Sequence, residues 1–542
     1  MKGKDKSSIT RRQFVKLTGA AALSSILPVP GIKSGKLLAE QFSKKKKPNI
    51  LFVFPDQHAR DMVGCYGNRD LLTPNLDNFA SEGVKFEECI SSSPVCTAYR
   101  GMLMSGQHSL YNGAITNDVP LLANNGKYFG EVLRDAGYKM GYIGKWHIYG
   151  GNRNQPIPPG KMRYGFDGTF LSDNCHVDFR PFKSYFWNDK GEKVFFDEWE
   201  VFGQTNQALE FLDNCSPESE DPFALFVSWH PPHEWGIHQD SLIYQYDTIS
   251  ELMNLYDPEK IHLRPSVEDN LAVRRSYQGY YGMISGVDTA FGWLMEKLRK
   301  KGLEDNTLVV FTSDHGDNLN SYNATIDKNL PQDTSTRVPL LMRFPNRLSK
   351  NTSSNILIGS MDIMPTILGL LDLKVPESVQ GRDLSTSILK RDDDAVESVP
   401  LFFLNPMWRG VYTRRYTYGF GVVGMFTHEP NGELGFKNFP VKSLYDRQSD
   451  PYQLKNLYGD RNAASLQREM ERLTQKWLDH FGDPGIELST EELSRIYLWS
   501  EGHAIPINNL LSYKGDLPRD TQEPGFRGRP IDILKKHYNK LN

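Results

Sequence analysis

Residues 49–57 read NILFVFPDQ, a continuous apolar run that ends in a carboxylate and an amide. A run of this length without polar alternation is typical of a β-strand that is buried on both faces. Three more runs of this kind, each also followed by polar side chains, lie at residues 140–144, 223–227 and 307–311. Stretches with helical spacing fall between them, at residues 74–81, 128–136, 205–213 and 289–301. This alternation predicts an α/β fold, with a large, mostly parallel mixed sheet flanked by helices.

The residues that directly follow these four strands carry the side chains of a chemical site. Open α/β sheets bind their ligands at the carboxyl ends of the strands, so these side chains are expected to meet at one edge. Carboxylates, an amide, imidazoles and a lysine in one place predict a metal site beside an anion pocket. The set comprises Asp56, Gln57, Lys145, His147, His230, His233, Asp314 and His315.

A further candidate is Cys96, which follows a Ser/Pro-rich loop at residues 91–95 and precedes a predicted helix that runs through Met104. A helix N-terminus lowers the pKa of a cysteine and attracts anions, and Arg100 lies on the same helix face. Spacing alone leaves two interpretations open. Cys96 is either a reactive cysteine beside an anion site or a buried structural cysteine next to a surface arginine.

The chain of 542 residues is 39% hydrophobic and 24% charged, which suits one large domain and a smaller one. Beyond residue 400 the pattern changes to antiparallel-strand alternation at residues 410–413 and 416–420, followed by helical spacing at residues 466–481. We therefore predict a main domain over residues 46–398. A smaller C-terminal α+β subdomain with an antiparallel sheet and a helix is predicted over residues 399–542.

Residues 1–39 resemble a bacterial twin-arginine export signal, with Arg11-Arg12 ahead of an apolar stretch at residues 17–27. The alternative is a frayed basic terminus. Removing residues 1–39, which carry eight Lys/Arg and one Asp, takes the net charge from −3 to −10. An acidic chain argues against nucleic acid as a partner, so an anionic substrate needs a local positive pocket. We expect a periplasmic or secreted protein that uses the twin-arginine export machinery and has no membrane span after cleavage.

Five cysteines are few and odd in number for an exported chain of this length, and a disulfide framework is not expected.

The hexapeptide Cys96-Thr97-Ala98-Tyr99-Arg100-Gly101 resembles the Cys-x-Ala/Pro-x-Arg signature of the type I sulfatases, which belong to the alkaline-phosphatase-like superfamily. Further motifs of that family extend the resemblance over most of the chain, at residues 48–50, 64–68, 73–77, 144–147, 313–316, 337–339, 444–446, 450–451 and 456–457. The resemblance implies an exported sulfatase that hydrolyses the sulfate ester of a carbohydrate or an aryl group. It identifies residues 46–398 as the catalytic domain.

The same resemblance implies that a dedicated maturation enzyme oxidises Cys96 to Cα-formylglycine. It also implies a metal held by Asp56, Gln57, Asp314 and His315 together with an oxygen of formylglycine 96. Many relatives have Asp-Asp and Asp-Asn where this chain has Asp56-Gln57 and Asp314-His315. A site with one carboxylate fewer and one imidazole more carries less negative charge and accepts a transition metal more readily. Ca²⁺ stays our first choice, and this change makes Mn²⁺ the second.

Arg100, Lys145 and Lys328 are implied to supply positive charge around the sulfate. Lys328 is chosen because it lies nine positions before Arg337, a spacing that resembles that of the family's sulfate-binding lysine. Sulfate-ester hydrolysis places negative charge on the ester and sulfuryl oxygens, which explains the need for fixed cations.

The family mechanism implies three proton-transfer and bond-forming roles. One hydroxyl of the hydrated aldehyde attacks sulfur and forms a covalent sulfate. His147 then deprotonates the second hydroxyl and expels sulfate. His233 donates a proton to the leaving alcohol; His230 is the competing candidate, but the family's histidine follows a proline, as His233 does.

The leaving-group pocket is expected from residues 150–199, which are rich in aromatic side chains suited to stacking on a sugar or aryl group. Within this stretch His176, Asp178 and Arg180 form a polar cluster that we predict to read hydroxyls or a carboxylate. Half of the aromatic side chains there are equally consistent with a protein core.

Two alternatives to a sulfatase stay open at this point. One is a phosphonate or phosphate mono- or diester hydrolase of the same superfamily, since relatives with Asp-Gln and Asp-His metal motifs include such enzymes. The other is a non-catalytic glycan-binding protein that keeps the fold and leaves Cys96 unmodified.

Overall fold

The strand predicted at residue 49 forms β1 in the middle of an eleven-stranded sheet. The computed structural model describes residues 46–150, 153–176, 178–237, 244–322, 327–404, 407–428, 434–483 and 485. The strand order is β12-β2-β11-β10-β1-β7-β3-β4-β5-β6, with β13 paired to β2. The strands of this sheet are β1 Asn49–Val53, β2 Val84–Ile90, β3 Lys139–Lys145, β4 Thr169–Asp173, β5 Tyr185–Trp187, β6 Lys193–Phe195, β7 Phe223–Ser228, β10 Thr307–Phe311, β11 Arg337–Arg343, β12 Thr352–Ser354 and β13 Ile358–Gly359.

The four predicted strands are confirmed as β1, β3, β7 and β10, and they are consecutive neighbours in the sheet. The pairs β10·β1, β1·β7 and β7·β3 are all parallel, so their carboxyl ends lie at the same edge. β11 pairs antiparallel with both β10 and β2, which makes the sheet mixed. The predicted fold class is therefore confirmed.

Helices cover both faces of this sheet. The α-helices are α3 Pro74–Glu82, α4 Cys96–Ser105, α5 Ser109–Asn112, α6 Phe129–Asp135, α7 Glu200–Asp213, α8 Ser250–Met253, α9 Leu271–Lys300, α10 Asp333–Thr336, α11 Ile363–Leu370, α12 Ser385–Lys390 and α13 Ala464–Phe481. Among the described residues, six 3₁₀ turns lie at Gly64–Tyr66, Lys161–Arg163, Pro258–Lys260, Glu304–Asn306, Ser360–Asp362 and Arg461–Ala463. In the part of the chain that the structure describes, no helix combines the length and the apolar character needed to cross a bilayer.

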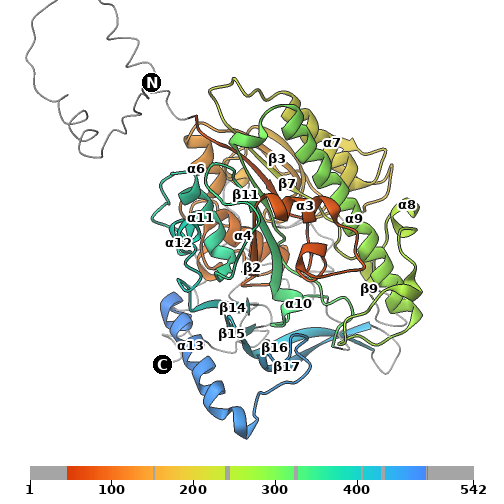
Figure 1. The fold of residues 1–542 in the computed structure, drawn as a ribbon, viewed down its shortest axis with the longest axis vertical. Coiled ribbons are helices and arrows are strands. Elements are labelled where there is room, and N and C mark those ends of the chain that lie inside the picture. Colours follow the sequence, from red (N-terminus) through yellow and green to blue (C-terminus); the bar gives the residue numbers. More distant parts are fainter. Residues whose placement is uncertain are drawn as a thin grey trace, which may run out of the picture. The chain divides into compact units, whose positions relative to one another are not determined.

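The alternation of side chains along β1 divides the interior into two cores. Ile50 and Phe52 pack into one core with residues of α4, α6 and α11. Leu51 and Val53 pack into the other core with residues of α3, α7 and α9. Figure 1 shows these two sets of helices on either side of the sheet. Because both faces are covered, β1 has no need of polar residues, which explains its unbroken apolar run.

A second, antiparallel sheet follows, as predicted, with the order β14-β15-β16-β17. α13 packs on it through Met470 and Leu473, which contact Val411 and Leu444 in one small core. A third, two-stranded sheet joins β8 and β9. The bounds are β14 Ser398–Leu404, β15 Met407–Thr413, β16 Tyr416–His428, β17 Leu434–Asp446, β8 Gly236–Ile237 and β9 Tyr244–Gln245.

The predicted domain limits at residues 46, 398 and 399 stay predictions. The export signal at residues 1–39 lies outside the described residues.

Candidate active site

Cys96 is the first residue of α4, as the loop-to-helix pattern predicted, and its side chain is fully buried. Its Sγ lies 3.2 Å from Nε2 of His315 and 3.6 Å from Oδ1 of Asp56. β1 and β10 are parallel neighbours, so Asp56, which follows β1, meets Asp314 and His315, which follow β10. The structure thus brings the predicted nucleophile together with three predicted metal ligands.

The donor set fits a divalent cation. One ligand atom from each of Asp56, Cys96, Asp314 and His315 lies within 4.8 Å of the others, and all four residues are buried. Two carboxylates are hard-oxygen ligands of the kind that Ca²⁺ prefers, and an imidazole is a ligand that Mn²⁺ also accepts. An oxygen at residue 96 in place of sulfur would complete a mostly oxygen set. The identity of the ion stays a prediction.

Gln57, the fourth predicted ligand, is held beside this cluster. Its backbone N–H donates to Oδ1 of Asp314 at 3.0 Å. Its side-chain Nε2 donates to Glu234 at 2.7 Å and to Asp317 at 2.9 Å, and its Oε1 accepts from Lys328 at 2.5 Å. Gln57 adopts a positive φ of 68°, a conformation that costs a non-glycine residue about 1–3 kcal/mol and is concentrated at functional sites.

Two buried cations neutralise the carboxylates of the cluster. Nη2 of Arg100 lies 3.1 Å from Oδ2 of both Asp56 and Asp314. Nζ of Lys145 lies 2.6 Å from Oδ2 of Asp56 and 3.6 Å from Sγ of Cys96. Burial acts to raise the pKa of Asp56, but Lys145, His233 and Arg100 together hold that pKa well below its ordinary value. Asp56 is therefore ionised throughout the physiological pH range.

The thiol of Cys96 is a poor nucleophile in this environment. Burial raises its pKa to about 12, and the Asp56 carboxylate acts in the same direction. A helix N-terminus was expected to lower this pKa. Burial outweighs that effect, so unmodified Cys96 is a neutral thiol at pH 7.

A glycine before Lys145 allows β3 to lie close to β7. Gly144 has a φ of +121°, and a Cβ at this position would come within 2.0 Å of the carbonyl oxygen of Ser228. Only glycine fits here, because both the conformation and the space exclude a side chain. The close approach places Lys145 and His147 next to the carboxyl end of β7.

The structure shows His147 in a chain of hydrogen bonds that the sequence did not predict. Nε2 of His147 lies 3.1 Å from Oδ1 of Asp118, and Arg153 donates to both oxygens of Asp118 at 2.7–3.0 Å. Nδ1 of His147 is buried and has no partner among the described residues. Burial first, and then Lys145, lower the pKa of His147 to about 3. His147 is therefore a neutral imidazole with its proton on Nε2 and a free lone pair on Nδ1.

His233 and Lys328 form the other side of the site. Nζ of Lys328 lies 3.0 Å from Nε2 of His233 and 2.7 Å from Oδ2 of Asp327. Nδ1 of His233 donates to the carbonyl oxygen of Glu234 at 2.8 Å. Burial and the Lys328 ammonium lower the pKa of His233 well below its ordinary value. His233 thus accepts a hydrogen bond from Lys328.

The competing candidate, His230, is also buried at the site. Its Nδ1 lies 2.9 Å from Oε1 of Glu200, and its Nε2 has no partner among the described residues. Burial raises the pKa of Glu200 to about 8.

Three acidic residues near Lys328 were missed in the sequence. Glu234 follows His233 directly, Asp317 lies three positions after Asp314, and Asp327 precedes Lys328. Burial raises the pKa of Glu234 to about 8 and that of Asp317 to about 6. Their proximity to predicted site residues in the sequence was the signal that would have found them.

The polar cluster predicted for substrate binding divides into two parts. The ring of His176 stacks on Tyr185 with centroids 4.6 Å apart. Arg180 donates to both oxygens of Asp178 at 2.9 and 2.7 Å, and its guanidinium lies over the ring of Trp235. Most aromatic side chains of residues 150–199 that were candidates for stacking are core residues: Tyr164, Phe166, Phe170 and Phe186 are at most 2% exposed.

Comparison with known proteins gives two family matches. The chain matches a family model described as Sulfatase over residues 48–373. It also matches a model described as N-sulphoglucosamine sulphohydrolase, C-terminal, over residues 323–479. The first match contains all the predicted catalytic and metal-binding residues.

Individual relatives are similar over nearly their whole length. The chain is 30% identical to an ulvan-active sulfatase of Formosa agariphila, over 87% of this chain and 90% of that protein. It is 28% identical to an endo-4-O-sulfatase of Bacteroides thetaiotaomicron, over 82% of this chain and 95% of that protein. Among solved structures, a sulfatase of Bacteroides fragilis matches with a TM-score of 0.70 and 29% identity, over 82% of this chain and 97% of that one.

Proposed function

The chain belongs to the sulfatase family and is a sulfuric ester hydrolase, and we propose that it removes sulfate from a sulfated carbohydrate through a formylglycine made from Cys96. The relatives named for ulvan and for an endo-acting 4-O-sulfatase both support a glycan substrate.

One observation carries the mechanistic part of the proposal. Cys96 is fully buried, its Sγ lies 3.2 Å from His315 and 3.6 Å from Lys145, and its thiol has a pKa of about 12. An inert thiol at the centre of a ring of catalytic side chains has no role of its own. A two-oxygen group at the same position has one, because the donors around it suit oxygen.

The two groups that complete the site each supply one kind of chemistry. Formylglycine 96, when hydrated, supplies the nucleophilic oxygen. A divalent cation, for which Ca²⁺ is our first choice and Mn²⁺ the second, would be held by Asp56, Gln57, Asp314 and His315. It would supply Lewis acidity at the sulfuryl oxygens.

The charges of the chain itself prepare the site for a sulfate. Asp56 and Asp314 are matched by Arg100 and Lys145, and Asp327 is matched by Lys328. A divalent cation therefore leaves an excess of positive charge in a buried site, which stabilises the anionic substrate and the charge that develops during hydrolysis.

We assign the proton transfers to two histidines of the site. His147 accepts a proton at Nδ1, which is free, while Asp118 stabilises the resulting imidazolium through Nε2. Nζ of Lys328 donates to Nε2 of His233 at 3.0 Å, and we assign to this pair the proton that the leaving-group oxygen receives. His230 serves instead if His233 is only a binding residue, since its Nε2 is also free.

The mass of the peptide that contains Cys96, from protein made in its own host, tests the proposal. We expect a peptide lighter than the cysteine form and reactive with a hydrazide probe. Cys96→Ala should abolish hydrolysis of an aryl sulfate, whereas the matched control Cys65→Ala, at a half-buried cysteine outside the site, should keep it. An intact thiol in fully active protein would contradict the proposal.

A second candidate activity, phosphonate or phosphate ester hydrolysis, is favoured by the imidazole at position 315 and the amide at position 57. Matched aryl sulfate and aryl phosphonate esters separate the two. We expect kcat/KM to be higher for the sulfate; dominant phosphonate turnover would favour the second candidate.

We also propose that the protein is exported through the twin-arginine pathway to the periplasm or the exterior. The support is the Arg11-Arg12 pair before an apolar stretch. Replacing both arginines by lysine should retain the protein in the cytoplasm, as measured by cell fractionation.

A further inference from the structure

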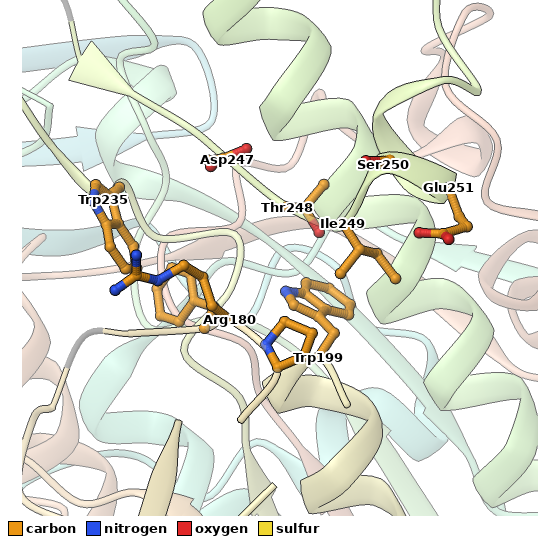
Figure 2. A pocket seen from close by; sticks show the side chains of 10 residues that line it. Arg180, Trp199, Trp235, Asp247, Thr248, Ile249, Ser250 and Glu251 are labelled. Atoms are coloured by element: carbon orange, nitrogen blue, oxygen red, sulfur yellow. The ribbon is translucent and has the colours of Figure 1, made fainter. Parts of the chain in front are cut away.

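A cavity of about 400 Å³ lies next to the catalytic site and has no role in the proposed mechanism. It is lined chiefly by three aromatic rings and three charged side chains: Phe179, Arg180, Trp199, Trp235, Asp247 and Glu251. Figure 2 shows Arg180 and Trp235 on one side of this cavity and Glu251 on the other. Its volume suits a small ligand such as a single sugar ring.

The cavity and the catalytic site share a wall made by the segments around β8 and β9. Glu234 contacts Gln57 and the Tyr246 hydroxyl contacts Asp317, so these two side chains belong to the catalytic side. Trp235, which follows Glu234, and Asp247, which follows Tyr246, both line the cavity. The backbone N–H of Trp235 donates to the carbonyl oxygen of Gln245 at 2.7 Å and joins the two segments.

The catalytic site opens to solvent on this side. The His233 side chain is 12% exposed and that of Glu234 is 13% exposed, whereas the side chains of Arg100 and Lys145 are 1% or less exposed. Phe179 lies between the catalytic site and the cavity, because its ring centroid is 5.9 Å from that of His230 and 5.8 Å from that of Trp235. A chain-like substrate that enters beside His233 therefore passes the cavity.

The lining suits a sugar ring. Trp235 is half-buried, and the face of its ring that Arg180 does not cover is of the kind that packs against the C–H face of a carbohydrate. Two polar atoms at the cavity, Nε1 of Trp199 and Oγ1 of Thr248, are buried without a partner among the described residues. Trp199 is 1% exposed. Unpaired buried donors at a cavity wall are expected to have a ligand or water as their partner.

The charge of the cavity selects against an anionic ring. Arg180 is the one cation of the lining, and both oxygens of Asp178 already hold it. Asp247 and Glu251 are exposed, and neither forms a salt bridge with a residue that the structure describes, although the charge of Asp247 helps to raise the pKa of Arg180. The excess negative charge favours hydroxyl groups that donate hydrogen bonds to carboxylates and repels carboxylate or sulfate groups.

We propose that this cavity is a subsite for an uncharged sugar ring that neighbours the sulfated ring in the same glycan chain. The inference rests on the proposed function and adds to it. The substrate is a sulfated oligo- or polysaccharide rather than a free monosaccharide, and one of its neighbouring rings carries neither carboxylate nor sulfate.

Steady-state kinetics of Trp235→Ala test the stacking role. We expect kcat/KM to fall about 5- to 10-fold for a singly sulfated galactan tetrasaccharide, mainly through KM, and to change less than about twofold for 4-nitrophenyl sulfate. Phe182→Ala is the control, because Phe182 is an exposed aromatic residue that directly follows the lining residues Phe179, Arg180 and Pro181 but does not itself line the cavity. Equal losses on both substrates would overturn the proposal.

Asp247→Asn tests the charge selection. Wild-type protein should prefer the galactan tetrasaccharide to a singly sulfated chondroitin tetrasaccharide, whose neighbouring rings carry carboxylates, and the variant should reduce that preference about tenfold. An unchanged preference would contradict the assignment.

Binding separates failure of this inference from failure of the proposed function. On an array of desulfated neutral and uronate-containing oligosaccharides, wild-type protein should retain neutral glycans and Trp235→Ala should not. This readout needs no sulfatase activity. Binding to none of the neutral glycans, or equal binding by the variant, would overturn the subsite whether or not sulfate esters are hydrolysed.

Discussion

Asp118 determines the protonation state of His147. Nε2 of His147 faces a carboxylate that Arg153 holds on both oxygens, so the proton lies on Nε2 and the lone pair on Nδ1. Burial keeps the imidazole neutral, with a pKa of about 3. Asp118 opposes that shift and supports the charge once a proton has been accepted. The proposed base therefore depends on the carboxylate that its Nε2 contacts.

Replacing Asp118 by Asn should lower kcat about 10²-fold with KM within about twofold, because the amide neither fixes the tautomer nor stabilises the imidazolium. Since His147 must be neutral to accept a proton, activity falls as the pH drops through its pKa. Loss of the carboxylate lowers that pKa, so the acid limb of the pH profile should move to lower pH.

The pH–rate profiles of wild type, Asp118→Asn and Asp118→Glu provide the check, with Asp118→Glu recovering part of kcat. A purely structural role for Asp118 predicts a lower unfolding midpoint and an unmoved acid limb, and that result would refute the positioning role.

The elements that carry the site have local sequence signals, and these were predictable. The apolar run of β1 and the start of α4 at Cys96 follow from patterns a few residues long. By contrast, only the last part of α9 was predicted, at residues 289–301. The part that was missed contains Gly279 and Gly286, whose intrinsic propensity disfavours a helix. In the structure, a Cβ on Gly279 would collide with the backbone of Tyr246, and one on Gly286 with the ring of Trp199. Packing against distant segments decides that helix.

Site residues on loops were predictable only where a motif marked them. Asp118 and Arg153 lie on loops without periodicity, and no local pattern brings them to His147. The cavity lined by Trp235 and Asp247 depends on how four separated segments pack. Such sites form only when distant segments pack together, and no local pattern in a single sequence predicts that packing.

A histidine and a tyrosine join α5 to the C-terminal elements; the Tyr111 hydroxyl donates to the carbonyl oxygen of Phe481 at 2.8 Å. The ring of His108 lies between Phe402 of β14 and Phe481 of α13, with centroids 4.0 and 4.3 Å away. Its Nδ1 accepts the N–H of Leu110 at 3.2 Å and caps the helix. Burial lowers its pKa to about 3, so it is neutral in the folded protein.

His108 should make the folded state sensitive to acid. A histidine with a lowered folded-state pKa contributes stability that is present above its unfolded pKa of about 6.5 and is lost as the pH falls toward about 3. The loss amounts to as much as about 1.4 kcal/mol per pH unit in that window. In His108→Asn, which keeps a capping side chain, the free energy of unfolding should be lower at pH 7.5 but should decline less steeply.

Denaturant unfolding of wild type and His108→Asn at pH 7.5, 6.0 and 5.0 measures both slopes. Parallel slopes would show that His108 is not the acid-sensitive group.

At the scale of the whole molecule, both sheets contribute to one catalytic centre. The large sheet supplies Asp56 and Asp314, while Trp408 of the small sheet donates to the carbonyl oxygen of Asn329 at 2.9 Å, beside Lys328. The carboxylates of Asp56 and Asp314 are also balanced in charge in the absence of an ion, because Arg100 and Lys145 face them. The fold therefore does not depend on a metal to hold its acidic residues together.

Removing divalent cations should inactivate the enzyme without unfolding it. After treatment with a chelator, aryl sulfate hydrolysis should be lost, and the unfolding midpoint should fall by only a few degrees, as expected for loss of one bound ligand. Adding back Ca²⁺ or Mn²⁺ in turn should restore activity and identify the ion. Full activity after exhaustive chelation would contradict the metal site, and global unfolding would contradict the charge balance.

The complete burial of Cys96 limits the time during which this side chain can be modified. Under the proposed mechanism, a modifying enzyme has to reach a side chain that no solvent touches once α4 has packed against the sheet. Oxidation must therefore come before folding, while the segment around residue 96 is still extended. A molecule that folds first keeps its thiol and stays inactive for its lifetime, so the active fraction of a preparation reports how fast the host modifies a nascent chain.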